Sequence, residues 1–257
     1  MKNTNQTAYW CELIYQLTKK EVKVRYKNSL FGYFWSLAYP LFLGGIYYYV
    51  FHKVMKVPFE SYPLFLVSGL FSWQWISASI TNAGAVFLSN AVIIRRVAFP
   101  REVLPFSIVL MEGLHFLCAI PVILLFLFDA DRTPALNWIW GIPLLWLLQV
   151  GFLTGICWIA AVTTPFLRDM ERFFSLGLMA VFYATPVLYP PNMVPQSWKW
   201  VLDFNPAASL TQAWRHLLID GILTMHEILI VLTFTLMSLI AGYTVFRWAS
   251  PRLAEVL

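Results

Sequence analysis

The amino-acid sequence predicts an all-α membrane protein with six transmembrane helices, and three observations lead to this fold class. Of the 257 residues, 60% are hydrophobic and only 12% are charged, whereas a soluble domain carries about 25% charged residues. The mean hydropathy is +0.67. The apolar residues form long uncharged runs, which favour helices because a helix satisfies its own backbone hydrogen bonds in hydrocarbon. A soluble fold, a disordered chain and a disulfide scaffold are therefore excluded.

The polar and basic N-terminal segment, residues 1–29, predicts an amphipathic helix at the cytoplasmic interface. Apolar side chains fall on one helical face, and the lysines lie mostly off that face. The predicted apolar face consists of Trp10, Leu13, Ile14, Leu17 and Val24. A disordered basic tail is the alternative interpretation.

Residues 30–257 are predicted to form a single transmembrane domain. Its spans lie within 30–51, 64–94, 103–128, 134–167, 173–188 and 228–246. With the N-terminus inside, thirteen of the eighteen lysines and arginines fall in cytoplasmic segments, and positive residues mark the inner side of a membrane. We therefore expect both termini in the cytoplasm and an even number of spans.

Two further segments carry packing signals. Gly151 and Gly155 have the GxxxG spacing that lets two helices approach closely, although this spacing is also common by chance. The segment 189–227, between the fifth and sixth spans, is interrupted by prolines at its start and reads as a helix over 207–219. Short helices that re-enter or lie on the outer leaflet are expected there, since re-entrant backbone is tolerated where protein or water covers it.

Catalytic and metal-binding motifs are absent from the sequence. HExxH, GxSxG and GxxxxGK[ST] do not occur, so we expect this chain not to hydrolyse ATP by the P-loop route. The three cysteines form no CxxC pair, and no metal site is predicted.

Glu112 is the one acid clearly inside a span, and His115 is its helical neighbour at i+3. The pair predicts a structural or gating contact, with proton coupling as the alternative.

Aromatic residues make up 18% of the chain and crowd the first two spans. At span ends they are typical of an interfacial belt. Nearer mid-span they favour a carbohydrate pathway, because the C–H face of a sugar stacks on an aromatic ring. Both interpretations stay open. The candidate channel residues are Tyr33, Trp35, Tyr39, Phe42, Phe71, Trp73 and Trp75.

Four motifs, in order along the chain, resemble those of ABC-2 type permeases that export O-antigen, capsule or teichoic acid. They are RYKNSLFGYFWS at 25–36 followed by Tyr39-Pro40, FLRDM at 166–170, TPVLY at 185–189, and Asn205-Pro206. In that family the last of these opens an outer re-entrant helix. The ordered set covers nearly the whole chain.

The resemblance implies an assembly in the inner membrane of a bacterium. It would be a homodimer of this chain, as the transport subunit and not an enzyme, with two copies of a separate ABC ATPase chain, which binds ATP and magnesium, so this chain would need no cofactor. The substrate would be a lipid-linked polysaccharide on an undecaprenyl diphosphate carrier, and it would pass between the two protomers. Membrane lipids are the other expected partners, and nucleic acid is not one.

The resemblance also assigns the cytoplasmic loops to coupling with the ATPase, because charge complementarity fixes the register of docked surfaces. A coupling helix is expected within 90–102, a second contact in the loop before the fifth span, and a third on the N-terminal helix. The candidates are Glu21, Arg25, Arg95, Arg96, Arg101, Glu102, Arg168, Asp169, Glu171 and Arg172. Arg25 and Lys27 are also candidates for contact with the carrier diphosphate.

Two other functions remain open from the sequence. The same fold could move a small hydrophobic compound or drug. An intramembrane enzyme acting on a lipid-linked sugar would need acids within the membrane, and Glu112 is the clear candidate for one.

Overall fold

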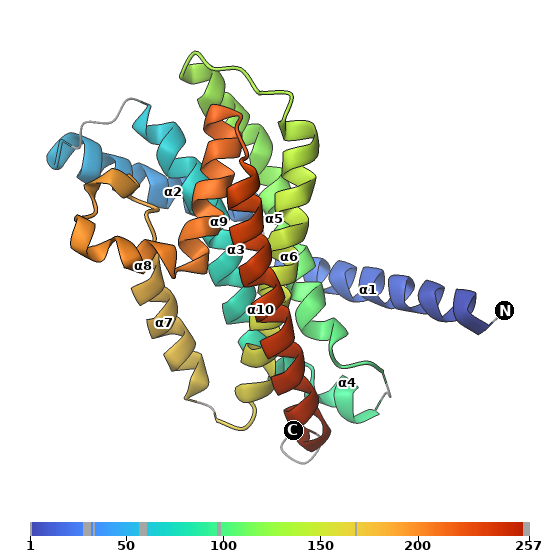
Figure 1. Ribbon diagram of the computed structural model, residues 1–257. Coiled ribbons are helices and arrows are strands. Elements are labelled where there is room, and N and C mark those ends of the chain that lie inside the picture. Colours follow the sequence, from blue (N-terminus) through green and yellow to red (C-terminus); the bar gives the residue numbers. More distant parts are fainter. Residues whose placement is uncertain are drawn as a thin grey trace.

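The structure, a computed structural model, describes residues 2–27, 32, 34–56, 61–96, 99–167 and 169–253, with side chains described from Ala8 onward. In this part of the chain all regular structure is helical and no strand occurs, which confirms the all-α prediction (Figure 1). The α-helices are α1 (Lys2–Tyr26), α2 (Phe34–Tyr47), α3 (Tyr62–Ser89), α4 (Ala91–Arg96), α5 (Val103–Asp129), α6 (Trp138–Thr163), α7 (Met170–Ala184), α8 (Lys199–Asp203), α9 (Pro206–Arg215) and α10 (Met225–Ala249). Shorter helical segments are η1 (Tyr48–Val54), η2 (Pro191–Met193), η3 (Gln196–Trp198), η4 (His216–Asp220) and η5 (Ser250–Arg252).

Four helices are long and apolar enough to cross a membrane among the described residues: α3, α5, α6 and α10. They match the second, third, fourth and sixth predicted spans. The first predicted span is α2, of 14 residues, continued by η1. The fifth is α7, whose 15 residues reach about 22 Å at 1.5 Å per residue, less than the ~30 Å of a hydrocarbon core. The six-span count therefore stays a prediction.

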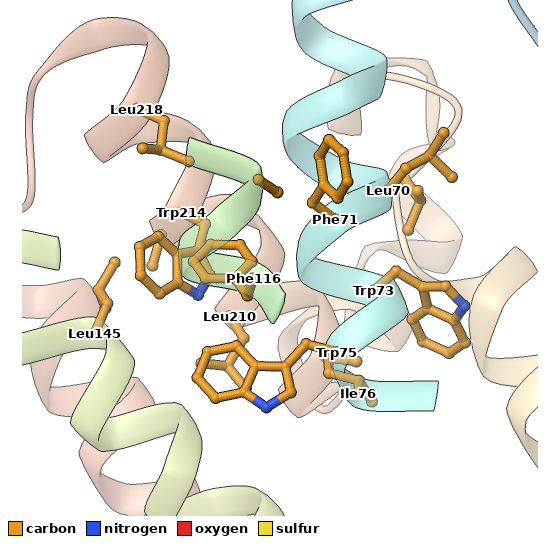
Figure 2. Packing of buried hydrophobic residues seen from close by; sticks show 14 of the residues in the cluster. Leu70, Phe71, Trp73, Trp75, Ile76, Phe116, Leu145, Leu210, Trp214 and Leu218 are labelled. Carbon is orange, nitrogen blue, oxygen red and sulfur yellow. The ribbon is translucent and has the colours of Figure 1, made fainter. Parts of the chain in front are cut away.

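Helix α3 occupies the centre of the bundle and packs against α2, α5, α6, α7 and α9 (Figure 1). Large aromatic side chains of α3 and its neighbours pack together in the core. Phe116 of α5 lies 5.3 Å from Trp75 and 4.5 Å from Trp214, measured between ring centroids (Figure 2). The indole of Trp214 donates to Gln149 Oε1 at 2.6 Å, so its polar atom is satisfied inside the core.

Helices α6 and α10 approach each other at glycines, as the GxxxG spacing predicts. A Cβ atom at Gly155 would lie 2.2 Å from the Ser238 carbonyl oxygen, and one at Gly242 would lie 2.2 Å from the Gly155 carbonyl oxygen. Gly151 faces Thr235 in the same seam. Larger side chains would force the helices apart, so the specific helix contact is confirmed.

Helix α1 extends sideways from the bundle and contacts it mainly through α5 (Figure 1). The structure confirms a helix over Lys2–Tyr26, which excludes the alternative of a disordered tail. Four of the five predicted apolar-face residues are partly buried, but Val24 is 59% exposed. The apolar stripe therefore ends before the last turn, where Arg25 and Tyr26 face the bundle instead.

The segment between α7 and α10 contains the short helices that the sequence predicts. The expected helix over 207–219 is α9 continued by η4, and it ends at Gly221 with a φ of +67°. Glycine suits this left-handed end because it lacks a Cβ atom. Figure 1 shows α9 alongside α3 and α10, so this segment folds back against the bundle.

Candidate functional site

Helix α2 separates its side chains into a packed face and an open face. Pro40 and Gly44 are buried, and a Cβ atom at Gly44 would lie 3.4 Å from Leu70 of α3. On the open face Trp35, Tyr39 and Phe42 are 53%, 54% and 71% exposed. Tyr33 lies outside the described residues. Helix α2, the first predicted span, thus presents an exposed aromatic face.

The aromatic residues of α3 lie in a different environment. Phe71, Trp73 and Trp75 are 4%, 8% and 2% exposed. Trp75 donates its indole N–H to the Val109 carbonyl oxygen at 3.2 Å, and Figure 2 shows it inside the core. Phe71 and Trp75 therefore pack in the hydrophobic core of the chain.

Trp73 points toward a cavity of about 220 Å³ between α2, α3 and α7, which we call the aromatic groove. Its ring lies 5.3 Å from that of Phe182, which in turn lies 6.1 Å from Tyr47. The lining combines these rings with hydrogen-bonding side chains. The lining includes Tyr39, Tyr47, Trp73, Gln74, Ser77 and Phe182. Aromatic faces beside an amide and a hydroxyl are a suitable surface for a sugar ring.

Helix α7 forms the other wall of the groove and contains no buried residue. Phe173, Leu176, Met179 and Tyr183 are 66%, 61%, 56% and 61% exposed. An exposed apolar surface of this size is typical of a site that contacts lipid or another protein chain.

The first two of the three predicted contacts, α4 and the start of α7, lie at the same end of the bundle as the C-terminal end of α10 (Figure 1). Arg95 and Arg96 are exposed on α4, while Ile94 is buried. The helix expected within 90–102 covers only Ala91–Arg96. Arg101 donates to the Ser250 carbonyl oxygen at 2.7 Å, and the Glu102 carbonyl oxygen accepts from Trp158 Nε1 at 3.1 Å. Arg101 and Glu102 thus form hydrogen bonds to distant segments of the chain, whereas the side chains of Arg95 and Arg96 are exposed.

The second predicted contact lies before α7. Asp169 is the N-cap residue of α7, and Asp169, Glu171 and Arg172 are all exposed. Acidic residues in a first helical turn interact favourably with the helix dipole. Arg168 lies outside the described residues.

The third predicted contact is divided between two surroundings. Glu21 pairs with Lys20 at 3.0 Å, and its side chain is 15% exposed, whereas Lys27 is exposed. Arg25 turns toward the bundle and pairs with Glu112 at 2.6 Å. Sequence reasoning missed this pair, because the two residues come from different helices and no local spacing relates them.

Glu112 and its partners form a polar cluster that we call the Glu112 cluster: Arg25, Tyr26, Asn82, Glu112 and His115. The predicted contact is present, with His115 Nδ1 at 3.2 Å from Glu112 Oε2. Asn82 Nδ2 donates to Glu112 Oε1 at 2.8 Å. Both carboxylate oxygens of Glu112 therefore have polar partners.

A second polar assembly joins the end of α7 to α9. Asn205 accepts from the backbone N–H of Ala207 at 3.0 Å as N-cap of α9, followed by Pro206 at the first helical position. The same side chain donates to Thr185 Oγ1 at 2.9 Å. The Asn-Pro and TPVLY motifs are thus in direct contact. Asn and Pro are favoured at these two positions because the cap accepts a free N–H and proline needs none.

Arg215 completes this assembly, which we call the outer clamp (Tyr62, Asn205 and Arg215). Arg215 is 4% exposed and donates to the carbonyl oxygens of Phe65, Pro186 and Val187, the last at 2.6 Å. Its guanidinium lies 3.6 Å from the centroid of the Phe65 ring. A buried backbone bend needs hydrogen-bond partners, and a guanidinium supplies several donors in one plane.

The outer clamp extends to the residues on either side of the bend. Tyr62 donates its hydroxyl to the Leu188 carbonyl oxygen at 2.8 Å, and Tyr189 donates to that of Tyr183 at 2.8 Å. Burial raises the pKa of Tyr189, so its hydroxyl stays protonated as a donor. Sequence reasoning counted Arg215 only as an outer basic residue. The signal that could have identified it is a lone charge within the apolar helix 207–219.

No cluster of three or more His, Cys, Asp or Glu side chains able to hold a metal ion occurs in the described residues. The functional surface that the structure offers is instead an open aromatic face, charged loops at one end of the bundle and a clamp at the other.

Comparison with known proteins gives a consistent set of relatives. Residues 12–219 match the family described as ABC-2 type transporter. The chain is 45% identical over 257 residues to an O-antigen export system permease protein, RfbA, of Klebsiella pneumoniae, covering 100% of this chain and 99% of the relative. It is 27% identical to the RfbA protein of Myxococcus xanthus, over 95% of this chain and 91% of the relative. It is 25% identical to the polysialic acid transport protein KpsM of Escherichia coli, over 89% and 90%.

Proposed function

Because this chain belongs to the ABC-2 type transporter family, we propose that it exports a lipid-linked polysaccharide, carried on undecaprenyl diphosphate, from the cytoplasmic side across a bacterial inner membrane. It is a multi-pass permease, a transport component and not an enzyme, and it acts with an ATPase partner. The observation that carries the substrate class is the open aromatic face of α2 beside the aromatic groove, together with near full-length similarity to O-antigen permeases.

The proposed topology has six spans: α2 with η1, α3, α5, α6, α7 and α10. Both termini lie in the cytoplasm, α1 lies at the inner interface, and α8 and α9 re-enter from the outer side. The shortness of α7 supports this arrangement, because α9 and the bend held by the outer clamp fill the part of the membrane that α7 does not reach.

The proposed assembly is a homodimer with two copies of the ATPase, which holds ATP and magnesium. Two protomers would face each other through α2 and α7, so that the exposed apolar side chains of one protomer pack against those of the other. The polysaccharide would pass between them. Stacking contributes about 0.5–1.5 kcal/mol per ring, which is weak enough for a chain of sugars to move from one ring to the next.

The ATPase would contact the exposed charges of α4 and of the first turn of α7, chiefly Arg95, Arg96, Asp169 and Glu171. The surface combines positive and negative residues, so a partner with the complementary pattern would dock in one register. Helix α7 runs from this surface to the outer clamp. Its movement would therefore reach α9 through Asn205 and Arg215.

The test is export by this chain assembled with its ATPase in proteoliposomes. The triple variant Trp35→Ala, Tyr39→Ala and Phe42→Ala removes the open aromatic face. Loss of three stacking contacts exceeds the 1.4 kcal/mol that corresponds to tenfold, so polysaccharide export is expected to fall roughly tenfold or more. Assembly with the ATPase should be unchanged.

The matched control is the triple variant Leu236→Ala, Met237→Ala and Ile240→Ala, which removes exposed apolar side chains of α10. It should export normally. Export that survives loss of the α2 aromatics would contradict the sugar pathway. A deletion strain that keeps its surface polysaccharide but becomes sensitive to a drug would favour the small-compound alternative.

A further inference from the structure

Glu112 is an acid held inside a membrane-spanning helix, at 4% exposure. An ionised carboxylate in such a place is costly unless it is paired and hydrogen-bonded. A neutral glutamine or an apolar residue would fill the same space without that cost. The acid therefore calls for a role that depends on its charge.

The partners of Glu112 come from three different helices. Arg25 of α1 lies at 2.6 Å and Asn82 of α3 at 2.8 Å, both from Oε1. His115 of α5 contacts Oε2 at 3.2 Å, and its other ring nitrogen lies 3.0 Å from the hydroxyl of Tyr26. With Nδ1 donating to Glu112, Nε2 accepts from Tyr26. One carboxylate thus ties the last turn of α1 to the middle of the bundle.

This connection lies at the junction between α1 and the first aromatic span. Arg25 and Tyr26 are the last two residues of α1, and α2 begins at Phe34. The Arg25 side chain is 30% exposed whereas the Glu112 side chain is 5% exposed. The fixed end of the ion pair is therefore in the bundle, and the end that can be displaced is on α1.

A second connection links α1 to the predicted ATPase surface. Lys20 donates from Nζ to Asn90 Oδ1, and Asn90 is the C-cap residue of α3, immediately before α4. The Asn90 side chain also donates to the Val86 carbonyl oxygen at 2.8 Å. Helix α1 is thus held at two points, one next to α4 and one at Glu112.

We infer that Glu112 is a positioning residue for coupling: by holding Arg25, it fixes a pivot at the end of α1, so that displacement of α1 and α4 is passed to α2. This inference rests on the proposed function. A helix that is fixed at one point turns about it, and the segment beyond the pivot must follow. Without the ion pair, the end of α1 would no longer be fixed to α5, and the displacement would not be passed on.

The first test is a double-mutant cycle on the complete complex with its ATPase in proteoliposomes, using Arg25→Met, Glu112→Gln and the double variant. The quantity measured is polysaccharide exported per ATP hydrolysed. Each single variant should lower this ratio by roughly tenfold, within the 5- to 150-fold range typical of coupling between sites. The double variant should be no worse than either single one, because both remove the same contact. Arg25→Lys, which keeps the charge, should restore most of the ratio.

The controls are Lys23→Met, exposed in the same turn of α1, and Leu114→Ala, 46% exposed on α5 between the two cluster residues. Both should leave the ratio unchanged. Effects of Arg25→Met and Glu112→Gln that multiply would show that Arg25 acts on the ATPase or the carrier diphosphate instead. A ratio that stays at the wild-type value, with only the amount of protein reduced, would show a purely structural pair. Either result overturns the inference.

A second measurement does not depend on the exported substrate. Amide hydrogen exchange is followed in the complex with and without ATP. In the wild-type complex, ATP should change exchange in α1, α4 and α2. In Glu112→Gln the change should persist in α1 and α4 but be lost in α2, and its persistence in α2 would overturn the inference. Failure of the wild-type complex to export polysaccharide would instead contradict the proposed function, leaving this readout intact.

Discussion

Helices α2 and α3 both begin with crowded aromatic residues, yet they place them in opposite surroundings. Phe42 of α2 is 71% exposed and Phe71 of α3 is 4% exposed, although the two residues are of the same type and both were candidates for a channel. Helix α3 is central and packs against α2, α5, α6, α7 and α9, so most of its side chains are buried, while α2 buries few of its own. The comparison teaches that aromatic composition identifies a membrane pathway only after the rotation of each helix is known.

The largest expected difference is between Phe71→Ala and Phe42→Ala. A large-to-small change in a packed core costs about 3–5 kcal/mol, so Phe71→Ala should strongly lower the thermal stability of the purified protein. Phe42→Ala should change the free energy of unfolding by less than about 0.5 kcal/mol. Thermal unfolding in detergent measures both. Equal destabilisation would contradict the difference in burial between Phe71 and Phe42.

A pair of glycines tests the same contrast through added volume. Gly155→Ala forces α6 away from α10 and should cost about 1–3 kcal/mol. Gly45→Ala lies on α2, where a Cβ atom would meet nothing within 4 Å, and alanine is a better helix former than glycine by about 1 kcal/mol. The two variants should therefore shift the unfolding temperature in opposite directions. A shift in the same direction would show that α2 is packed after all.

The outer clamp should give a smaller effect. Asn205→Ala removes an N-cap, which typically costs about 1–2 kcal/mol, and also the bond to Thr185. Ser209→Ala, one turn later in α9, is the matched control, since its hydroxyl contributes only a weak bond to the Asn205 carbonyl oxygen at 3.5 Å. The unfolding temperature of Asn205→Ala should fall clearly below that of Ser209→Ala. Equal values would mean that the cap does not stabilise α9.

The smallest expected effect on stability is that of Asp169→Asn, because the side chain is exposed and makes no capping bond. Its free energy of unfolding should change by less than about 0.5 kcal/mol. ATP hydrolysis by the assembled complex should nevertheless fall, because the docking charge is lost. Normal coupled hydrolysis would remove Asp169 from the proposed ATPase contact.

Long uncharged runs were sufficient to predict α3, α5, α6 and α10, because burial in hydrocarbon depends on composition over a whole helix. The i+3 spacing also predicted the contact between Glu112 and His115. Arg25 as their partner was not predictable, since a contact between distant segments leaves no local pattern. Arg215 was missed for a related reason: its three carbonyl partners belong to two other segments. Val24 lies on the predicted apolar face yet is 59% exposed, because at this turn Arg25 and Tyr26 face the bundle.

The shortness of α7 has a consequence for how the protein is made. Its 15 residues are too few to hold a segment in hydrocarbon securely while synthesis continues, and the side chains that secure its end, Asn205 and Arg215, are translated later. We therefore expect nascent chains that end near residue 200 to leave α7 poorly inserted, and chains that reach beyond residue 220 to insert it. Stable insertion of α7 would then depend on residues that are translated after it.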